Sequence, residues 1–175
     1  MKDLIDKFSS YNIFNYLLPG VLFAALGDRL TSYSLLIDDI VVGVFIYYFI
    51  GLVISRIGSL FLEPLLKWLK IVNFAPYSDF LKAASSDNKI ELLSEANNMY
   101  RTLSSVFICL AVLKFIEFLE RTYPSISSYT SIIFILLLAL LFVFSYRKQS
   151  NYISLIISCA IQSKAVSNDQ DKEET

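Results

Sequence analysis

Residues 132–144 read Ile-Ile-Phe-Ile-Leu-Leu-Leu-Ala-Leu-Leu-Phe-Val-Phe, a run without a single polar side chain. A second apolar block, residues 40–62, carries one charged side chain, Arg56. A helix needs roughly 17–25 mostly apolar residues to cross a hydrocarbon core about 30 Å thick. The two blocks therefore predict an integral membrane protein.

Four segments approach the length of a membrane span, and backbone polar groups in lipid must be satisfied within each segment. We therefore expect an all-α integral membrane protein, a bundle of about four transmembrane helices. The expected spans are residues 11–26, 40–62, 103–119 and 129–146. Pro19 and Gly20 interrupt the first of them, so a re-entrant or strongly tilted helix stays an alternative there.

The distribution of Lys and Arg predicts the orientation. With the N-terminus inside, the inner segments 1–10, 63–102 and 147–175 hold eleven of these residues and the two outer loops hold two. We expect a multi-pass membrane protein with both termini in the cytoplasm.

The same pattern divides the chain into five parts. Residues 1–10 form an N-terminal amphipathic segment and residues 11–62 a first transmembrane pair. Residues 63–102 form a helical cytoplasmic loop, and residues 103–146 a second transmembrane pair. Residues 147–175 are expected to form a cytoplasmic apolar helix and an acidic tail.

The composition argues against several classes of function. Hydrophobic residues make up 55% of the chain and charged residues 18%, below the quarter that is typical of soluble domains. The net charge of −1 gives no basic field, so we expect no direct binding of nucleic acid. There is no histidine, and Cys109 and Cys159 both lie in apolar stretches. With no nucleotide-binding, metal-binding or nucleophile motif, we expect neither an enzyme nor a cofactor or metal site.

Small residues recur every four positions in the first two spans. Gly20 and Ala24 lie on the first, and Gly51, Ser55 and Ser59 on the second. This spacing lets helices approach closely in a membrane. It favours either a contact that holds an oligomer or packing within one bundle, and both interpretations stay open.

Three charged residues fall within the predicted spans. Arg56 is seven positions before Glu63, so it can pair with that carboxylate, extend to the interface or line a polar cavity. Lys114 and Glu117 are three apart and can meet on one helical face, although solvated interfacial charges are the alternative.

Two apolar features lie outside the spans. Trp68, flanked by lysines, is typical of an anchor at the level of the headgroups. Residues 152–161 are apolar but too short to cross the bilayer, and such a helix must bury most of its surface. It can lie in the interface, pack on the 63–102 loop or dock on a partner, for which the candidate residues are Trp68, Tyr152, Leu155 and Ile156.

Residues 10–20 read Ser-Tyr-Asn-Ile-Phe-Asn-Tyr-Leu-Leu-Pro-Gly. With this opening and the four-span layout, the chain resembles KwaA, the small membrane subunit of the Kiwa anti-phage defence system. The resemblance implies an oligomeric membrane sensor that recruits a soluble DNA-binding partner on the cytoplasmic side. It implies no catalytic residue.

The leading hypothesis is therefore an oligomeric inner-membrane sensor or scaffold that recruits a soluble cytoplasmic effector in anti-phage defence. The alternative is a pore-forming effector or small ion channel, in which Asn12, Asn15 and Arg56 of several copies face a lumen.

Overall fold

The computed structural model describes the backbone of residues 13–173. It describes the side chains of residues 13–161, apart from those at positions 14, 82, 85, 88, 126 and 127. Every regular element in this part is a helix, which confirms the all-α prediction. The predicted amphipathic segment 1–10 and Asn12 lie outside the described residues. The elements are η1 (Ile13–Leu17), α2 (Leu18–Leu30), α3 (Ile40–Ile57), η2 (Gly58–Leu62), α4 (Glu63–Trp68), α5 (Tyr77–Ser86), α6 (Asn88–Thr122) and α7 (Pro124–Glu173).

Three stretches in the described part are long and apolar enough to cross a membrane: Ile40–Trp68, Lys89–Thr122 and Ser128–Ile161. The first joins α3, η2 and α4 without a break. The predicted span at residues 11–26 is not among them. There the helical segment runs through η1 and α2 over residues 13–30, and polar residues at both of its ends, Asn15 at one and Asp28 and Arg29 at the other, shorten its apolar part.

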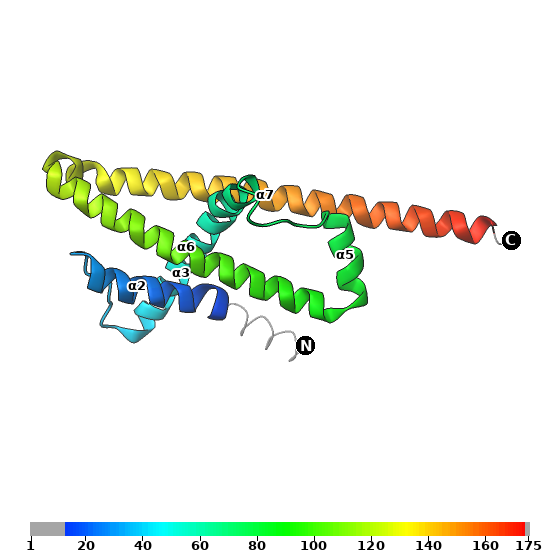
Figure 1. Cartoon of the computed structure of the whole chain (residues 1–175), viewed down its shortest axis with the longest axis horizontal. Coiled ribbons are helices and arrows are strands. Elements are labelled where there is room, and N and C mark those ends of the chain that lie inside the picture. The colour runs from blue at the N-terminus through cyan, green and yellow to red at the C-terminus, as the bar shows by residue number, and fades with distance from the viewer. Residues whose placement is uncertain (1–12, 174–175) are drawn as a thin grey trace.

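The helices form an elongated bundle (Figure 1). Helices α6 and α7 run antiparallel from the turn at Tyr123, and α2 lies along the half of α6 nearest that turn. Helix α5 stands at the other end of α6, and α7 extends past every other labelled helix.

Side chains of the flanking loops define two of the helix starts. Asp39 accepts hydrogen bonds from the amides of Val41 and Val42 at 2.9 and 3.0 Å. Asp87 accepts one from the amide of Lys89 at 2.9 Å. Each carboxylate satisfies amides that the first turn leaves without a partner, which fixes where α3 and α6 begin.

The buried core lies where α2, α3 and α6 meet. Ile54, Val106 and Leu110 form its centre, and side chains of α2 such as Phe23 pack against them. Helix α7 contributes less to this core. In its most apolar stretch of 18 residues 11% is buried, compared with 28% in the corresponding stretch of Lys89–Thr122. The apolar surface of α7 therefore faces outward, as expected of a helix in contact with lipid.

The small residues are packed within the chain. A Cβ added to Gly20 would overlap the carbonyl of Tyr47, and one added to Gly51 would overlap the carbonyl of Tyr16. Ala24 of the same strip is fully buried. At this crossing η1 and α2 meet α3 backbone to backbone, so the contact belongs to one protomer.

On the helical stretch Ile40–Trp68, the small residues after Gly51 contact two further neighbours. Ser55 accepts a 3.3 Å hydrogen bond from Thr102 of α6, and Ser59 accepts one of 2.7 Å from Lys148 of α7. Gly51, Ser55 and Ser59 therefore contact three different parts of the bundle in turn.

The C-terminal part differs from the prediction. The expected span at 129–146 and the apolar residues 152–161 do not form separate helices, because α7 runs unbroken from Pro124 to Glu173. The physical reason is that no glycine or proline follows Pro124 to interrupt the helical hydrogen bonds.

We predict that Gly51→Ala lowers the free energy of unfolding by about 1–3 kcal/mol, because the new methyl group must displace the backbone of Tyr16. Thermal unfolding of the purified protein in mild detergent measures this. Gly43→Ala on the same helix is the control, since its Cβ would meet only the ring of Tyr47, at 3.3 Å, and Ile37, at 3.8 Å. Equal unfolding temperatures for the two variants would contradict the packing argument.

Candidate functional site

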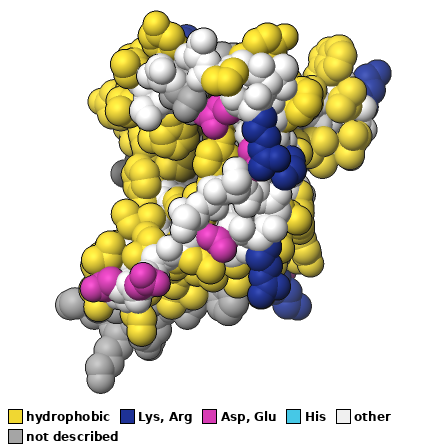
Figure 2. Space-filling view, turned by 90° about the vertical axis from the view of Figure 1, so that its left-hand side faces the viewer, with side chains coloured by type: hydrophobic (Ala, Val, Ile, Leu, Met, Phe, Trp, Pro, Cys, Tyr) yellow, Lys and Arg dark blue, Asp and Glu magenta, His cyan; other side chains and the backbone are white. Residues whose placement is uncertain are grey.

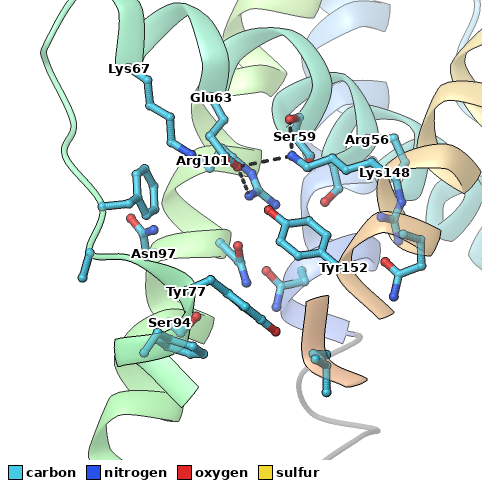
Figure 3. Close-up of a pocket in the computed structure, with 18 of the residues that line it drawn as sticks. Arg56, Ser59, Glu63, Lys67, Tyr77, Ser94, Asn97, Arg101, Lys148 and Tyr152 are labelled. Carbon is cyan, nitrogen blue, oxygen red and sulfur yellow. Dashed lines mark hydrogen bonds and ion pairs between the residues drawn. The ribbon is translucent and has the colours of Figure 1, made fainter. Parts of the chain in front are cut away.

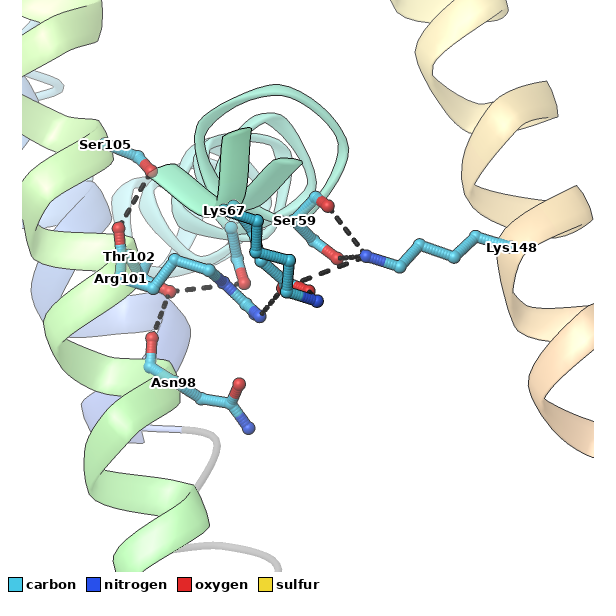
Figure 4. Close-up of polar contacts among 9 residues, drawn as sticks. Ser59, Lys67, Asn98, Arg101, Thr102, Ser105 and Lys148 are labelled. Atoms are coloured by element: carbon cyan, nitrogen blue, oxygen red, sulfur yellow. Dashed lines mark hydrogen bonds and ion pairs between the residues drawn. The ribbon is translucent and has the colours of Figure 1, made fainter. Parts of the chain in front are cut away.

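One carboxylate forms ion pairs with basic side chains of three helices. The side chain of Glu63 is 10% exposed and lies 2.9 Å from Lys67 Nζ of α4 and 2.8 Å from Arg101 Nη1 of α6. Lys148 of α7 follows at 3.8 Å. Figure 4 shows Arg101 and Lys148 reaching this point from opposite sides. Glu63 therefore ties the three candidate spans together at one end of the bundle.

Local structure explains why these groups meet. Glu63 and Lys67 are four apart on a helix, a spacing that brings their side chains together. The five-residue π-helix η2 ends at Leu62, immediately before Glu63. Within η2, Ser59 accepts two hydrogen bonds from Lys148 Nζ at 2.7 Å, one at its carbonyl and one at its hydroxyl. Lys148 is thus held by Ser59 as well as by Glu63.

These residues border a half-open cleft with a volume of about 550 Å³, within the range of small-molecule sites. We call it the Glu63 cleft, and it is defined by Asn15, Arg56, Glu63, Arg101, Lys148 and Tyr152. Figure 3 shows Lys67, Arg101 and Lys148 converging on Glu63, with Tyr77 and Tyr152 across the opening.

The cleft is basic and its walls carry aromatic rings. Among the described residues, Glu63 is the only acidic one that lines it, whereas four basic residues do: Arg56, Lys67, Arg101 and Lys148. The rings of Tyr77 and Tyr152 lie 5.6 Å apart, so α5 closes one side against α7. Lys67 lies 4.2 Å from the ring of Phe74, a cation–π contact that helps to hold the loop after α4.

The opposite end of the bundle has its own carboxylate centre, which we call the Glu117 cluster. Glu117 is 4% exposed and pairs with Lys114 at 2.8 Å and with Arg121 at 2.6 Å. It also accepts the amide of Ser32 at 3.1 Å, while Lys114 donates to the carbonyl of Leu30 at 2.7 Å. The cluster therefore fastens the loop after α2 onto α6.

Glu120 extends this attachment by a second route. It accepts hydrogen bonds from Tyr33 Oη at 2.6 Å and from Thr130 Oγ1 at 2.7 Å. Burial, and next the hydrogen bond to Glu120, raise the pKa of Tyr33 to about 12, so its hydroxyl stays a donor even in moderately alkaline solution. Figure 2 views this end of the molecule and shows acidic and basic side chains among a mainly hydrophobic surface.

The structure places the sequence-predicted site residues in different settings. Lys114 and Glu117 meet in the Glu117 cluster. Of the three alternatives for Arg56, the described residues show it lining the Glu63 cleft, and they give it no ion pair with Glu63. The carboxylate is already occupied by Lys67, Arg101 and Lys148.

The predicted docking residues also differ among themselves. Trp68 is exposed at the end of α4. Tyr152 packs on Tyr77 and lines the cleft together with Ile156. Leu155 lies outside the cleft and is 42% exposed.

Sequence reasoning missed Glu63 as a centre, and it missed Arg101, Lys148 and Asn15 as its neighbours. One signal was available. The inner ends of the predicted spans bring Glu63, Arg101 and Lys148 to a similar depth, and a lone acid among bases at one depth indicates an ion-pair centre.

No protein-family model, no curated protein and no solved structure matches this chain. The resemblance to the Kiwa membrane subunit therefore rests on the sequence pattern alone and stays a prediction.

We predict that Glu63→Gln lowers the free energy of unfolding by about 2 kcal/mol, because it leaves crowded cations without their carboxylate. Thermal unfolding followed by the fluorescence of Trp68, the single tryptophan, measures this. The control is Glu91→Gln, at an exposed position of α6 without an ion pair among the described residues. A shift no larger than that of the control would refute the role of Glu63.

We predict that Glu117→Gln speeds amide hydrogen exchange in residues 31–39, because this loop loses the charged acceptor of Ser32. Mass spectrometry of peptides from this loop gives the rate. Asp38→Asn is the control, since Asp38 is exposed and makes no side-chain hydrogen bond to the described residues. Unchanged exchange in the Glu117 variant would show that other contacts hold the loop.

Proposed function

We propose that this chain is an oligomeric membrane scaffold of the bacterial inner membrane that holds a soluble cytoplasmic effector. In this proposal, copies pair through the part of α7 that continues beyond the bilayer. The single observation that carries it is the apolar and exposed character of that part. Anti-phage defence is the setting that the resemblance to the Kiwa membrane subunit favours.

The length of α7 supports the proposal. Its 50 residues measure about 75 Å, while a bilayer core takes about 30 Å. If the span begins near Ser128, about 20 residues bring it to Arg147 and Lys148, whose charges suit the interface. Residues 152–161 then stand outside the hydrocarbon layer.

Their surface is unusual for a helix in water. Exposed apolar side chains point around the helix: Ile153, Leu155, Ile156, Ile157 and Ile161. A contiguous apolar surface of this kind on a soluble segment marks an interaction site.

The polar residues in this stretch do not oppose burial. Ser154 and Ser158 donate their hydroxyls to backbone carbonyls one turn earlier, at 3.1 and 2.9 Å. Ser154 and Ser158 are four apart and so form one polar line along the helix, and neither hydroxyl donor is left unsatisfied when the apolar side chains beside this line are buried. A second copy of the same helix is our proposed occupant, since it brings an apolar surface of equal length.

The charge distribution supports a cytoplasmic location for this end. The side with the loop 63–102 and the C-terminal segment holds most of the Lys and Arg residues, and Trp68 lies exposed beside it. A soluble effector would meet the paired α7 segments and α5 on this side.

A second candidate function is a pore, and one observation favours it. Asn15 and Arg56, which the channel hypothesis places at a lumen, line the same cleft. Ion flux through liposomes that contain the purified protein would separate this function from a scaffold.

The decisive experiment is a mild-detergent pull-down of tagged protein from its native host, sized by light scattering. The proposal expects an oligomeric membrane core with a soluble protein in fixed ratio, and loss of that protein when residues 152–175 are deleted. A monomer without a partner would refute it.

We predict that Leu155→Glu shifts the detergent-solubilised protein to a smaller species, because a charge cannot be buried between two α7 helices. Light scattering after size-exclusion chromatography measures the mass. Ser154→Glu adds the same charge on the polar line of the helix and should leave the mass unchanged. An equal mass for both variants and the parent would exclude pairing through this face.

A further inference from the structure

The Glu63 cleft carries more positive charge than its own carboxylate can balance. Arg56, Lys67, Arg101 and Lys148 line it, while Glu63 is the only acidic residue that does so in the described part of the chain. Like charges this close repel one another, and more strongly beside apolar walls than in water. An anion that enters the cleft would remove this repulsion.

Arg56 is the one cation of the group that has no partner among the described residues. It forms no hydrogen bond or ion pair with the described residues, while the other three bases all reach Glu63. Its guanidinium offers a planar fork of donors that matches the oxygens of a phosphate group.

Two buried polar atoms in the cleft also have no hydrogen-bond partner in the structure: Arg101 Nε and Asn15 Oδ1. Asn15 is 3% exposed and lines the cleft, so its amide is a polar side chain in the bundle without a full set of partners. Rotating the amide by half a turn replaces Oδ1 with an N–H donor. Buried polar groups without partners are rare, and a water molecule or a bound polar group can satisfy them.

We infer that the Glu63 cleft is a binding site for a phosphate group, held by the guanidinium of Arg56 together with Arg101 and Asn15, which line the same cleft. Lys148 adds charge from the opposite wall. This inference is independent of whether α7 pairs with a second copy.

The position of the cleft allows two sources for the phosphate. It opens where the candidate spans Ile40–Trp68 and Ser128–Ile161 carry Glu63 and Lys148, close to the expected level of the headgroups. An anionic lipid can place its headgroup there from the bilayer, and a soluble phosphate compound can enter from the cytoplasm. The recognition chemistry is the same in both cases.

The test uses the full-length protein in mild detergent, titrated at constant ionic strength, with chloride making up the balance. The probes are inorganic phosphate, dioctanoyl phosphatidylglycerol and, as the tail control, dioctanoylglycerol. Trp68 fluorescence and the unfolding temperature report binding. We expect saturable binding of at least one phosphate probe and none of the control.

Arg56→Gln should weaken binding about tenfold, since it removes a charge-assisted fork without breaking any ion pair of Glu63. Arg147→Gln is the matched control, because Arg147 lies outside the cleft and next to Lys148. Should Arg56→Gln fail to fold, Asn15→Asp replaces it, as a carboxylate in that place repels the anion.

Each result has a definite meaning. Binding of inorganic phosphate that Arg56→Gln weakens supports the site and assigns a soluble source. Binding of the phosphatidylglycerol alone, weakened in the same way, supports the site and assigns the lipid headgroup. Absence of binding, or binding that Arg56→Gln and Arg147→Gln change equally, overturns the inference.

Discussion

The carboxylate of Glu63 is the interaction on which the arrangement of the long helices depends. Of the side chains that the structure describes, it is the one that α4, α6 and α7 all contact through charge, by way of Lys67, Arg101 and Lys148. In an apolar surrounding a charge without partners is costly, whereas one with several hydrogen-bonded partners is stable. The ion pairs therefore fix the depth of each helix relative to the others.

The middle of the bundle is held by a different means. There, glycines at positions 20 and 51 let η1 and α2 meet α3 at the distance of backbone contact, and the buried Ile54, Val106 and Leu110 fill the space beside them. Lipid gives no hydrophobic drive for helices to associate, so close packing of small residues supplies it. Packing holds the centre, and carboxylates at Glu63 and Glu117 hold the two ends.

The sequence predicted the elements better than their connections. Apolar length indicated the spans at 40–62, 103–119 and 129–146, because the thickness of a bilayer leaves little freedom there. The four-residue spacing of Gly51, Ser55 and Ser59 indicated a packed face but not its partners. Arg56 and Glu63 share a helical face, yet only the fold shows that Arg101 and Lys148, far along the chain, reach Glu63 first. Pairing across helices depends on topology, which periodicity does not contain.

Helix α7 stands apart from this scheme, because its polar attachments lie far apart along it. Thr130 donates to Glu120 near the turn, Lys148 reaches Ser59, and Tyr152 contacts Tyr77. Between Thr130 and Lys148, the ring of Phe142 on α7 stacks on that of Phe49 on α3, with 6.0 Å between the ring centroids. Lys148 therefore attaches α7 to the bundle close to the point where the helix begins to extend past the other helices. Since Lys148 also lines the Glu63 cleft, the charge balance of the cleft and the attachment of α7 depend on the same ammonium group.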